Sequence, residues 1–350
     1  MNSLDRLIVF LSRILANFRR KLIKVAKAKD DALISLYGGH LESNFKWTER
    51  KLLRKLEVIN FLHPRDKIFQ GHIFNEEYSC VLHNVVVDSQ TGLVFLKDGQ
   101  ILEESTAWPK DHLLLNSVPK PMFTCVSKRI EDFNVVILPS NGFYHWLVED
   151  LPIFLETIER FPDSKVMVYE RAPSYVLDFL TMQGYVYQFI PRYSRLERLN
   201  FVNKGPNTEW SHPKHLSILR KEFSQFRNPK SSKIKIYVSR ETSTRSPFFE
   251  NWLVSSLDKS GWLIVKAEEL SLSDQISLFS SAGVICGVHG AGLSGMVWMP
   301  SNASVIELSP KNFVPCFARM ASALNFKYTL INFSGKPKDQ ILNEILNASE

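Results

Sequence analysis

A strand, a glycine-rich turn, a short helix and a second strand follow one another within residues 283–310. Residues 283–288 are all apolar or small, the turn spans His289 to Gly292, and the next apolar run contains Glu307. A buried strand that leads through small residues into a helix aims backbone N–H groups and the positive end of the helix dipole at one place. The small residues also let a ligand approach the backbone closely. This segment therefore predicts a phosphate or diphosphate site at the turn, with Glu307 accepting hydrogen bonds from a ribose or sugar.

Strand and helix patterns alternate on both sides of a polar, proline-containing segment at residues 203–231. Such alternation is typical of βαβ units around parallel sheets, and 350 residues are enough for two domains. We therefore expect an α/β fold with two Rossmann-like lobes facing a cleft, covering residues 32–205 and 206–350. The predicted strands are 133–138, 165–169, 187–190, 233–238, 262–266, 283–288, 305–308 and 328–331, and the predicted helices are 144–161, 174–183, 214–226, 251–258, 273–282 (capped by Ser273) and 312–324.

Residues 76–101 show a different pattern, in which apolar and polar residues alternate. The pair Asp98-Gly99 within this stretch is typical of tight turns between strands. Antiparallel strands are expected here.

The first 31 residues carry most of the positive charge of the chain. Eight basic and two acidic residues within residues 1–30 give +8 − 2 = +6, against +7 for the whole chain. Apolar residues recur at helical spacing between the basic ones, which predicts a basic amphipathic helix over residues 1–31 on an anionic membrane surface. The alternative is a helix that packs on the body of the protein or on a partner chain. The apolar run Leu7–Ser12 is too short to span a membrane, and Arg13 interrupts any secretory signal. A cytoplasmic protein at the inner face of the membrane is therefore expected.

Several classes of protein are disfavoured by what the sequence lacks. The body of the chain is close to neutral, which disfavours a nucleic-acid-binding face. The four cysteines are scattered, which argues against a zinc module or a disulfide framework. There is no Asp-x-Asp pair to hold a metal against a diphosphate, so no metal or other cofactor is expected. A phosphate-binding Gly-x-x-x-x-Gly-Lys-Ser/Thr loop and a Gly-x-Ser-x-Gly elbow are also missing.

Two groups of residues have the chemistry of a transfer site. Arg240 directly follows a predicted strand and Arg245 comes five residues later, so both can bind phosphate oxygens at the carboxyl end of a sheet. In the other lobe, His145 and Glu149 lie one helical turn apart, and a histidine with such a carboxylate can act as a general base. Trp146 either stacks on a sugar or base or packs in the core. Asp150 points away from His145 on an α-helix and is not expected in the site.

These features together make the chain resemble glycosyltransferase family 61, a group related to capsular polysaccharide biosynthesis proteins and formerly a domain of unknown function. The similarity spans about residues 130–310. The family's usual Asn-Glu is reversed here as Glu250-Asn251, so neither residue is given a role. The matching positions are Asn141, Tyr144, His145, Trp146, Glu149, Leu151, Pro152, Ser239, Arg240, Arg245, Glu269, Leu270, Ser271, Gln275, Leu278, Phe279, Ala282, Gly287, His289, Gly290, Ala291, Gly292, Leu293 and Glu307.

The resemblance implies a GT-B-like fold and metal-independent transfer, with inversion, from a nucleotide-sugar donor. Arg240, Arg245 and the turn His289-Gly290-Ala291-Gly292 would bind the diphosphate and Glu307 the ribose or sugar, while His145 or Glu149 would deprotonate the acceptor. A glycan or lipid-linked glycan of capsule, lipopolysaccharide or a similar cell-surface polysaccharide is the expected acceptor. The alternative is a non-catalytic nucleotide-sugar-binding or assembly protein of the same fold. A phosphotransferase would require a metal site that the sequence does not show.

Overall fold

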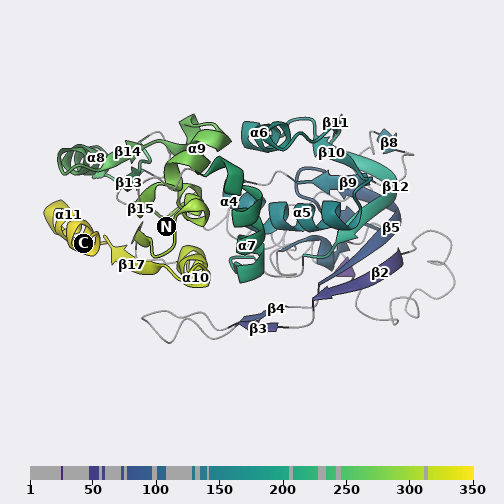
Figure 1. Ribbon diagram of the computed structural model, residues 1–350, viewed down its shortest axis with the longest axis horizontal. Helices are drawn as coiled ribbons and strands as arrows, with labels where there is room; N and C mark the ends of the chain where they lie inside the picture. Colours follow the sequence, from purple (N-terminus) through teal and green to yellow (C-terminus); the bar gives the residue numbers. More distant parts are fainter. Residues whose placement is uncertain are drawn as a thin grey trace, which may run out of the picture.

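The computed structural model contains two main sheets, each associated with helices (Figure 1). It describes residues 25–26, 47–54, 57–59, 72–74, 77–96, 101–107, 128–130, 135–139, 142–204, 208–227, 234–241, 246–310 and 314–350.

The first sheet has ten strands and mixes antiparallel with parallel pairing. Its centre is β12 (Tyr193–Val202), which pairs antiparallel with β5 (Glu77–Asp88) and parallel with β9 (Val135–Leu138). The parallel part continues from β9 to β10 (Lys165–Tyr169) and β11 (Tyr187–Ile190), as the alternating pattern predicts. The prediction missed β12. The other strands are β1 (Val25–Ala26), β2 (Trp47–Arg54), β6 (Val94–Phe95), β7 (Ile101–Leu102) and β8 (Lys128–Ile130), and β3 (Glu57–Ile59) pairs separately with β4 (His72–Phe74).

A long helical run connects β9 to β10 and is not uniformly α-helical. It starts as α4 (Phe143–His145), widens into the π-helix η2 (Trp146–Asp150) and continues as α5 (Leu151–Arg160). Gly142 precedes it with φ 68°, a left-handed conformation that favours glycine. Next along the chain come α6 (Ser174–Met182), β12, α7 (Pro213–Glu222) and the 3-10 turn η3 (Ser224–Phe226). The helix α7 packs on α5 and also on the 3-10 helix η5 (Ala291–Trp298) of the second half.

The second sheet has five parallel strands in the order β14-β13-β15-β16-β17. From β13 the chain moves to one side to form β14 and then crosses back to β15, so the strand order reverses between β13 and β15. In sheets of this kind, ligands bind beyond the carboxyl ends of the strands at such a switch point. The strands are β13 (Ile234–Val238), β14 (Leu263–Val265), β15 (Ala282–Val288), β16 (Ser304–Ser309) and β17 (Lys327–Asn332).

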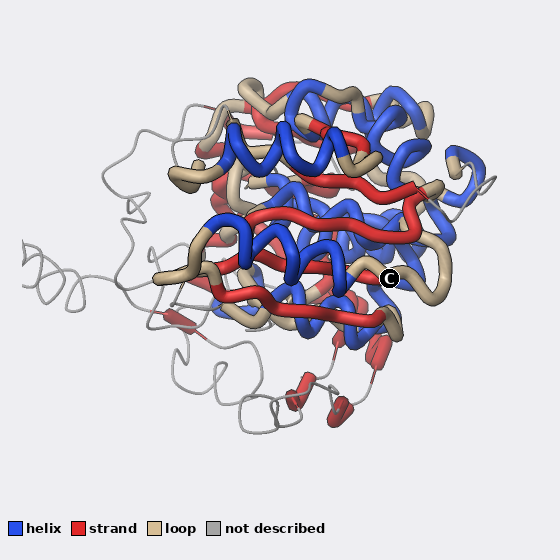
Figure 2. The backbone as a smooth tube through the Cα atoms, turned by 90° about the vertical axis from the view of Figure 1, so that its left-hand side faces the viewer, coloured by secondary structure: helices blue, strands red, loops and turns tan. Residues whose placement is uncertain are grey.

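Helices cover both faces of this sheet. The helices α8 (Glu250–Lys259) and α11 (Lys338–Ala348) lie on the outer face, in front of the strands in Figure 2. The inner face, toward α4 and α7 in Figure 1, is covered by α9 (Leu272–Phe279), η5 (Ala291–Trp298) and α10 (Cys316–Ala323). One hydrophobic cluster joins this inner face to α5, α6 and α7, so the two halves share a continuous core. The remaining turn is η4 (Ala267–Glu269), and η1 (Glu103–Ser105) belongs to the first half.

Some local expectations need correction. The helix α9 is capped by Ser271, whose hydroxyl accepts from the Asp274 N–H, and not by Ser273; it ends at Phe279, before the start of β15. The short helix after the glycine turn is a 3-10 helix.

The amino-terminal prediction is only partly covered by the structure. Of residues 1–31, only Val25–Ala26 are described, and they pair with β7 as a strand instead of continuing a helix. The predicted turn at Asp98-Gly99 lies outside the described residues, between the antiparallel strands β6 and β7. No helix in the described part of the chain is both long and apolar enough to cross a bilayer.

Candidate functional site

The switch point of the second sheet brings Arg240 to the glycine-rich turn. Arg240 follows β13, and Nη1 of its guanidinium donates a hydrogen bond of 2.6 Å to the carbonyl oxygen of His289, which follows β15. The adjacent Gly290 lies directly against the guanidinium, because a Cβ added there would come within 3.0 Å of its Cζ and Nη1. A side chain at this position would therefore force the guanidinium to shift by a few tenths of an ångström.

The backbone of Arg240 is hydrogen-bonded to Glu250, a residue to which the sequence analysis assigned no role. Glu250 is 1% exposed and begins α8. One of its carboxylate oxygens accepts from the Arg240 N–H at 2.7 Å, and the other accepts from the Tyr237 hydroxyl at 2.8 Å. Burial, together with the charge of Glu250, raises the pKa of Tyr237 well above its ordinary value. The carboxylate thus fixes the end of β13, where the chain leaves the sheet.

A cavity of about 400 Å³ lies at this edge and has walls from both halves of the chain. The second half contributes Arg240, Gln275, Glu268 and the turn, while the first contributes Phe143 and other residues. The predicted binding residues Arg240, Gly290, Ala291 and Gly292 all line it, whereas His145 and His289 are not among its described lining residues. The cavity lies between the predicted diphosphate-binding residues and the start of the helix that carries His145.

His289 and Glu307 form a hydrogen-bonded pair next to the turn. Nδ1 of His289 lies 2.6 Å from Glu307 Oε1, and the Tyr328 hydroxyl donates to Glu307 Oε2 at 2.6 Å. Glu307 is fully buried, and both of its oxygens are occupied. The prediction that Glu307 binds the ribose or sugar directly is therefore wrong for this structure. Its side chain instead orients the imidazole of His289, a quarter of which is exposed.

His145 and Glu149 form a second pair of the same kind. Nδ1 of His145 lies 2.9 Å from Glu149 Oε2, as their spacing of one helical turn predicts. The other oxygen of Glu149 accepts from the Thr208 hydroxyl at 3.1 Å and from the Glu209 N–H at 3.2 Å. The Glu149 side chain is 7% exposed and that of His145 is 28% exposed. Of the two, His145 is the one that an acceptor can reach.

The local charges favour protonation of His145. Burial lowers its pKa, but the hydrogen bond to Glu149 and the charges of Glu149, Asp150 and Glu209 outweigh this and raise the pKa above its ordinary value. Asp150 was not expected near His145; the π-helix changes the angle per residue, and π-helical turns occur frequently at functional sites. Asp150 also forms a buried ion pair with Lys204, and burial raises its own pKa despite that partner.

The segment that holds Glu149 is itself anchored by the second half of the chain. Glu209 has φ 66°, a left-handed conformation that is unusual for a residue with a side chain. Arg319 of α10 lies with Nη1 3.7 Å from Glu209 Oε2, and its Cζ is 3.4 Å from the centroid of the Trp210 ring. These contacts couple the position of Glu149 to α10.

Phe317 links the two histidine–glutamate pairs. Its ring centroid lies 5.2 Å from that of His289 and 5.4 Å from that of Tyr144, the residue before His145. Both edge-to-face contacts are of a kind that stabilises aromatic clusters. The two pairs therefore lie on either side of Phe317. Arg240 donates to the backbone carbonyl of His289 in one of these pairs.

Two predicted site residues remain. Trp146 has no exposed surface and packs against Phe143, Tyr175 and Phe179, so its ring has no free face and the predicted stacking on a sugar is wrong for this structure. Its other predicted role, in the core, is the one observed. Arg245 lies outside the described residues.

The residues that sequence reasoning missed act through long-range contacts. Glu250, Thr208 and Arg319 lie outside the recognisable motifs, and each acts on a residue of a different element. A signal was available for Glu250, because it lies in the segment where the family pattern has an acidic residue.

Comparison with known proteins identifies a matching family. The model for the family Glycosyltransferase 61 matches residues 143–306. The EGF domain-specific O-linked N-acetylglucosamine transferase of Gallus gallus is 30% identical over 120 residues, which are 32% of this chain and 22% of that protein. The protein of the same name from Drosophila melanogaster is 30% identical over 104 residues, 29% of this chain and 20% of that protein.

A plant protein matches over a shorter stretch. The alpha-1,3-arabinosyltransferase XAT2 of Oryza sativa subsp. japonica is 35% identical over 86 residues, 23% of this chain and 14% of that protein. The chain thus spans about a fifth or less of the length of these curated relatives.

Proposed function

We propose that this chain, whose residues 143–306 match the family Glycosyltransferase 61, transfers a sugar, with inversion, from a nucleotide-sugar to a hydroxyl of a glycan acceptor. The observation that carries the proposal is the cavity that Arg240 and the glycine turn share with Phe143, two residues before His145. A donor bound there would contact the cationic group of Arg240 and would lie next to the start of the helix that carries His145, a residue that can accept a proton.

The second half of the chain supplies groups suited to a diphosphate. The guanidinium of Arg240 can bind phosphate oxygens and offset the negative charge that develops on a departing diphosphate. Gly290 and Gly292 line the cavity, where the absence of a side chain leaves room for the Arg240 guanidinium and for Val238. We propose that this positive charge serves in place of a metal ion in the transfer. Because Glu307 is buried, Glu268, an exposed residue of the cavity wall, is our candidate for binding donor hydroxyls.

The first half supplies the base. Since Nδ1 of His145 is bonded to Glu149, Nε2 is the nitrogen that would accept the proton of the acceptor hydroxyl. The acceptor oxygen then forms a bond with the anomeric carbon as the bond from that carbon to the diphosphate oxygen breaks. The nucleoside diphosphate leaves, and the proton remains on His145. Glu149 orients the imidazole and stabilises its cationic form, so it is a positioning residue.

His289 is suited to a role on the donor side. Its Nδ1 is bonded to Glu307, and its backbone carbonyl is bonded to Arg240. With Nδ1 donating to Glu307, Nε2 carries a proton only in the imidazolium form, and in that form it can donate a hydrogen bond to a phosphate oxygen of the leaving group. The two histidines would thus act on opposite ends of the reaction.

The acceptor and the location follow from the charge pattern. The net charge of +6 within residues 1–30 (eight basic residues, two acidic) supports attachment to an anionic membrane surface. We propose a cytoplasmic enzyme at the inner face of the membrane that extends a glycan or lipid-linked glycan of a cell-surface polysaccharide such as capsule or lipopolysaccharide.

A panel of sugar nucleotides tests this proposal with the full chain. One or more donors should raise its melting temperature and should release nucleoside diphosphate when glycan or lipid-linked acceptors are added. His145→Gln should lower turnover by about 10²–10⁴-fold and leave the thermal shift by the donor intact. The control is Glu159→Gln, which removes an exposed carboxylate from the same helical run. Binding without turnover, unchanged in His145→Gln, would instead favour a non-catalytic nucleotide-sugar-binding protein. If no donor binds, the proposal is wrong.

A further inference from the structure

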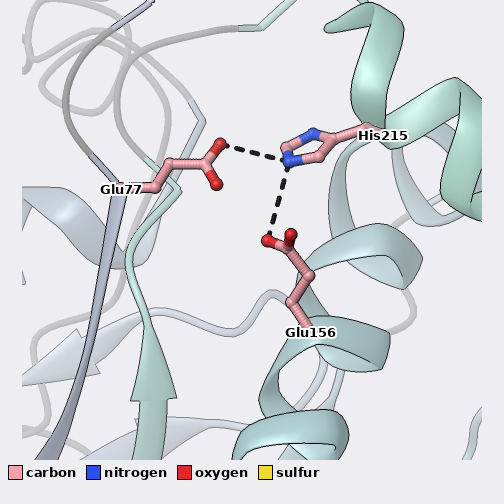
Figure 3. A group of neighbouring side chains, drawn as sticks. All are labelled: Glu77, Glu156 and His215. Atoms are coloured by element: carbon pink, nitrogen blue, oxygen red, sulfur yellow. Dashed lines mark ion pairs between the residues drawn. The ribbon is translucent and has the colours of Figure 1, made fainter. Parts of the chain in front are cut away.

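Three side chains with metal-ligating atoms meet away from the proposed transfer site (Figure 3). Nε2 of His215 lies 3.1 Å from Glu77 Oε1 and 4.0 Å from Glu156 Oε2. Glu77 is 4% exposed and Glu156 is 7% exposed. In Figure 3 both carboxylates point toward the same nitrogen of the imidazole.

The three residues come from three elements that are far apart in the sequence. Glu77 begins β5, Glu156 lies in the middle of α5, and His215 lies in the first turn of α7. Since α5 and α7 pack against each other and β5 belongs to the first sheet, packed elements hold each ligand. This rigidity would spare an ion much of the entropic cost of ordering its ligands.

We propose that Glu77, Glu156 and His215 bind a divalent first-row transition metal ion, with Zn²⁺ as the best fit. One imidazole and two carboxylates are a ligand set that zinc accepts, with a water molecule as the fourth ligand. Bonds of about 2.0–2.1 Å in a tetrahedral site place ligand atoms roughly 3.3 Å apart. The separations of 3.1 and 4.0 Å fall on either side of this value, and all three ligand atoms lie within 4.8 Å of one another, so rotation of the carboxylates would bring them to an ion.

The ligand types of the group fit the same ion. Metal ions bind carboxylate oxygens and a ring nitrogen of histidine, and Glu77 Oε1, Glu156 Oε2 and His215 Nε2 supply these atoms at one place.

The site would have a structural role, separate from the transfer reaction. Glu156 follows Glu149 by seven residues along one helical run, which corresponds to a distance of about 10 Å. His215 follows closely after Thr208 and Glu209, which hold Glu149. The ion would therefore tie the start of α7 to α5 and β5 and stabilise the segment that positions Glu149. This inference does not depend on the identity of the donor or acceptor.

Metal uptake by the full chain tests the proposal. The protein is stripped with a chelator, reloaded with Zn²⁺ or with Mn²⁺ in a parallel sample, desalted and analysed by mass spectrometry for metal content. About one Zn²⁺ per chain is expected, and titration calorimetry should show at least about tenfold weaker binding in Glu156→Gln and in His215→Gln. Glu159→Gln, an exposed position on the same helix as Glu156, should bind like the wild type.

The possible results separate a metal site from a plain ion pair. No uptake of either metal by the wild type, or equal uptake by both variants, would show that the trio is only an ion-pair cluster. If the variants fail to fold, X-ray absorption spectroscopy of the zinc-loaded wild type identifies the atoms that bind the metal. A first shell of nitrogen and oxygen with one histidine supports the site, and a sulfur ligand overturns it.

Discussion

Replacing Glu149 with Gln removes the charge that most directly favours protonation of His145. The amide oxygen of Gln can still accept the hydrogen bond from Nδ1, which keeps the tautomer of the ring, while the amide NH2 then faces the Glu209 N–H and cannot accept its hydrogen bond. What is lost is a carboxylate 2.9 Å from the imidazole nitrogen, on a side chain that is only 7% exposed. An opposite charge at this range shifts a pKa by about 1–3 units. Because 28% of the His145 side chain is exposed, solvent screens part of this charge, and we expect the pKa of His145 to fall in Glu149→Gln toward the lower end of that range.

The pKa is measured directly by NMR titration of the histidine ring signals, with His145→Gln used to assign the resonance. In the wild type, the pKa of His145 should lie above about 6.5, since the pair with Glu149 raises it. In Glu149→Gln it should fall below the wild-type value, and in the control Glu159→Gln it should not change. A pKa of His145 that is equal or higher in Glu149→Gln would refute the electrostatic argument.

The same variant makes two further predictions about pH. Because the folded-state pKa of His145 is raised, the stability it contributes is fully present below the unfolded pKa and is lost as pH rises through the folded pKa. The loss of unfolding free energy in Glu149→Gln should therefore be larger at pH 6 than at pH 9. For transfer, a base must be unprotonated, so the acid limb of the rate profile should move to lower pH. The plateau at high pH should fall by about tenfold, because the weaker base accepts a proton less readily.

Three other substitutions test the structure of the site. Gly290→Ala adds a Cβ within 3.0 Å of the Arg240 guanidinium, so donor affinity measured by calorimetry should fall by about tenfold. The melting temperature of the protein should change little. Unchanged donor affinity would argue against Arg240 as a donor ligand. Glu250→Ala removes the acceptor of the buried Tyr237 hydroxyl and of the partly buried Arg240 N–H, so it should cost about 2–4 kcal/mol of unfolding free energy in urea denaturation. Tyr237→Phe should cost less. Trp146→Ala should lower the unfolding free energy by about 3–5 kcal/mol, and Trp146→Phe should lower it by less. If Trp146→Ala slowed transfer to the acceptor without lowering stability, Trp146 would instead stack on the sugar.

Much of the parallel architecture is predictable because its signals are local. The strands β10, β11, β13 and β15 and the helices between them follow from runs of apolar residues and from helical spacing. In contrast, β12 at the centre of the first sheet was missed. It alternates poorly, with Arg195, Glu197 and Arg198 along its length, and it exists because β5 and β9 pair with its two edges. Pairing with strands far away in the sequence leaves no periodic signal within the strand itself.

The candidate site shows the same division between local and long-range information. The pair of His145 and Glu149 could be predicted, because residues one helical turn apart meet on any regular helix. The role of Glu307 could not, because its direction depends on Tyr328 in the next strand, which occupies one of its oxygens. A carboxylate at a strand end looks the same in the sequence whether it faces a ligand or a buried hydroxyl.

The amino-acid sequence thus determined the glycine turn, the arginine at the end of β13 and the histidine–glutamate spacing, since each is fixed by the geometry of a few consecutive residues. Tertiary packing alone decided that Glu250 holds Arg240, that Trp146 is buried, and that Glu77, Glu156 and His215 come together. The physical reason is that a side chain's partners depend on which elements share a core, and that arrangement is set by the whole chain.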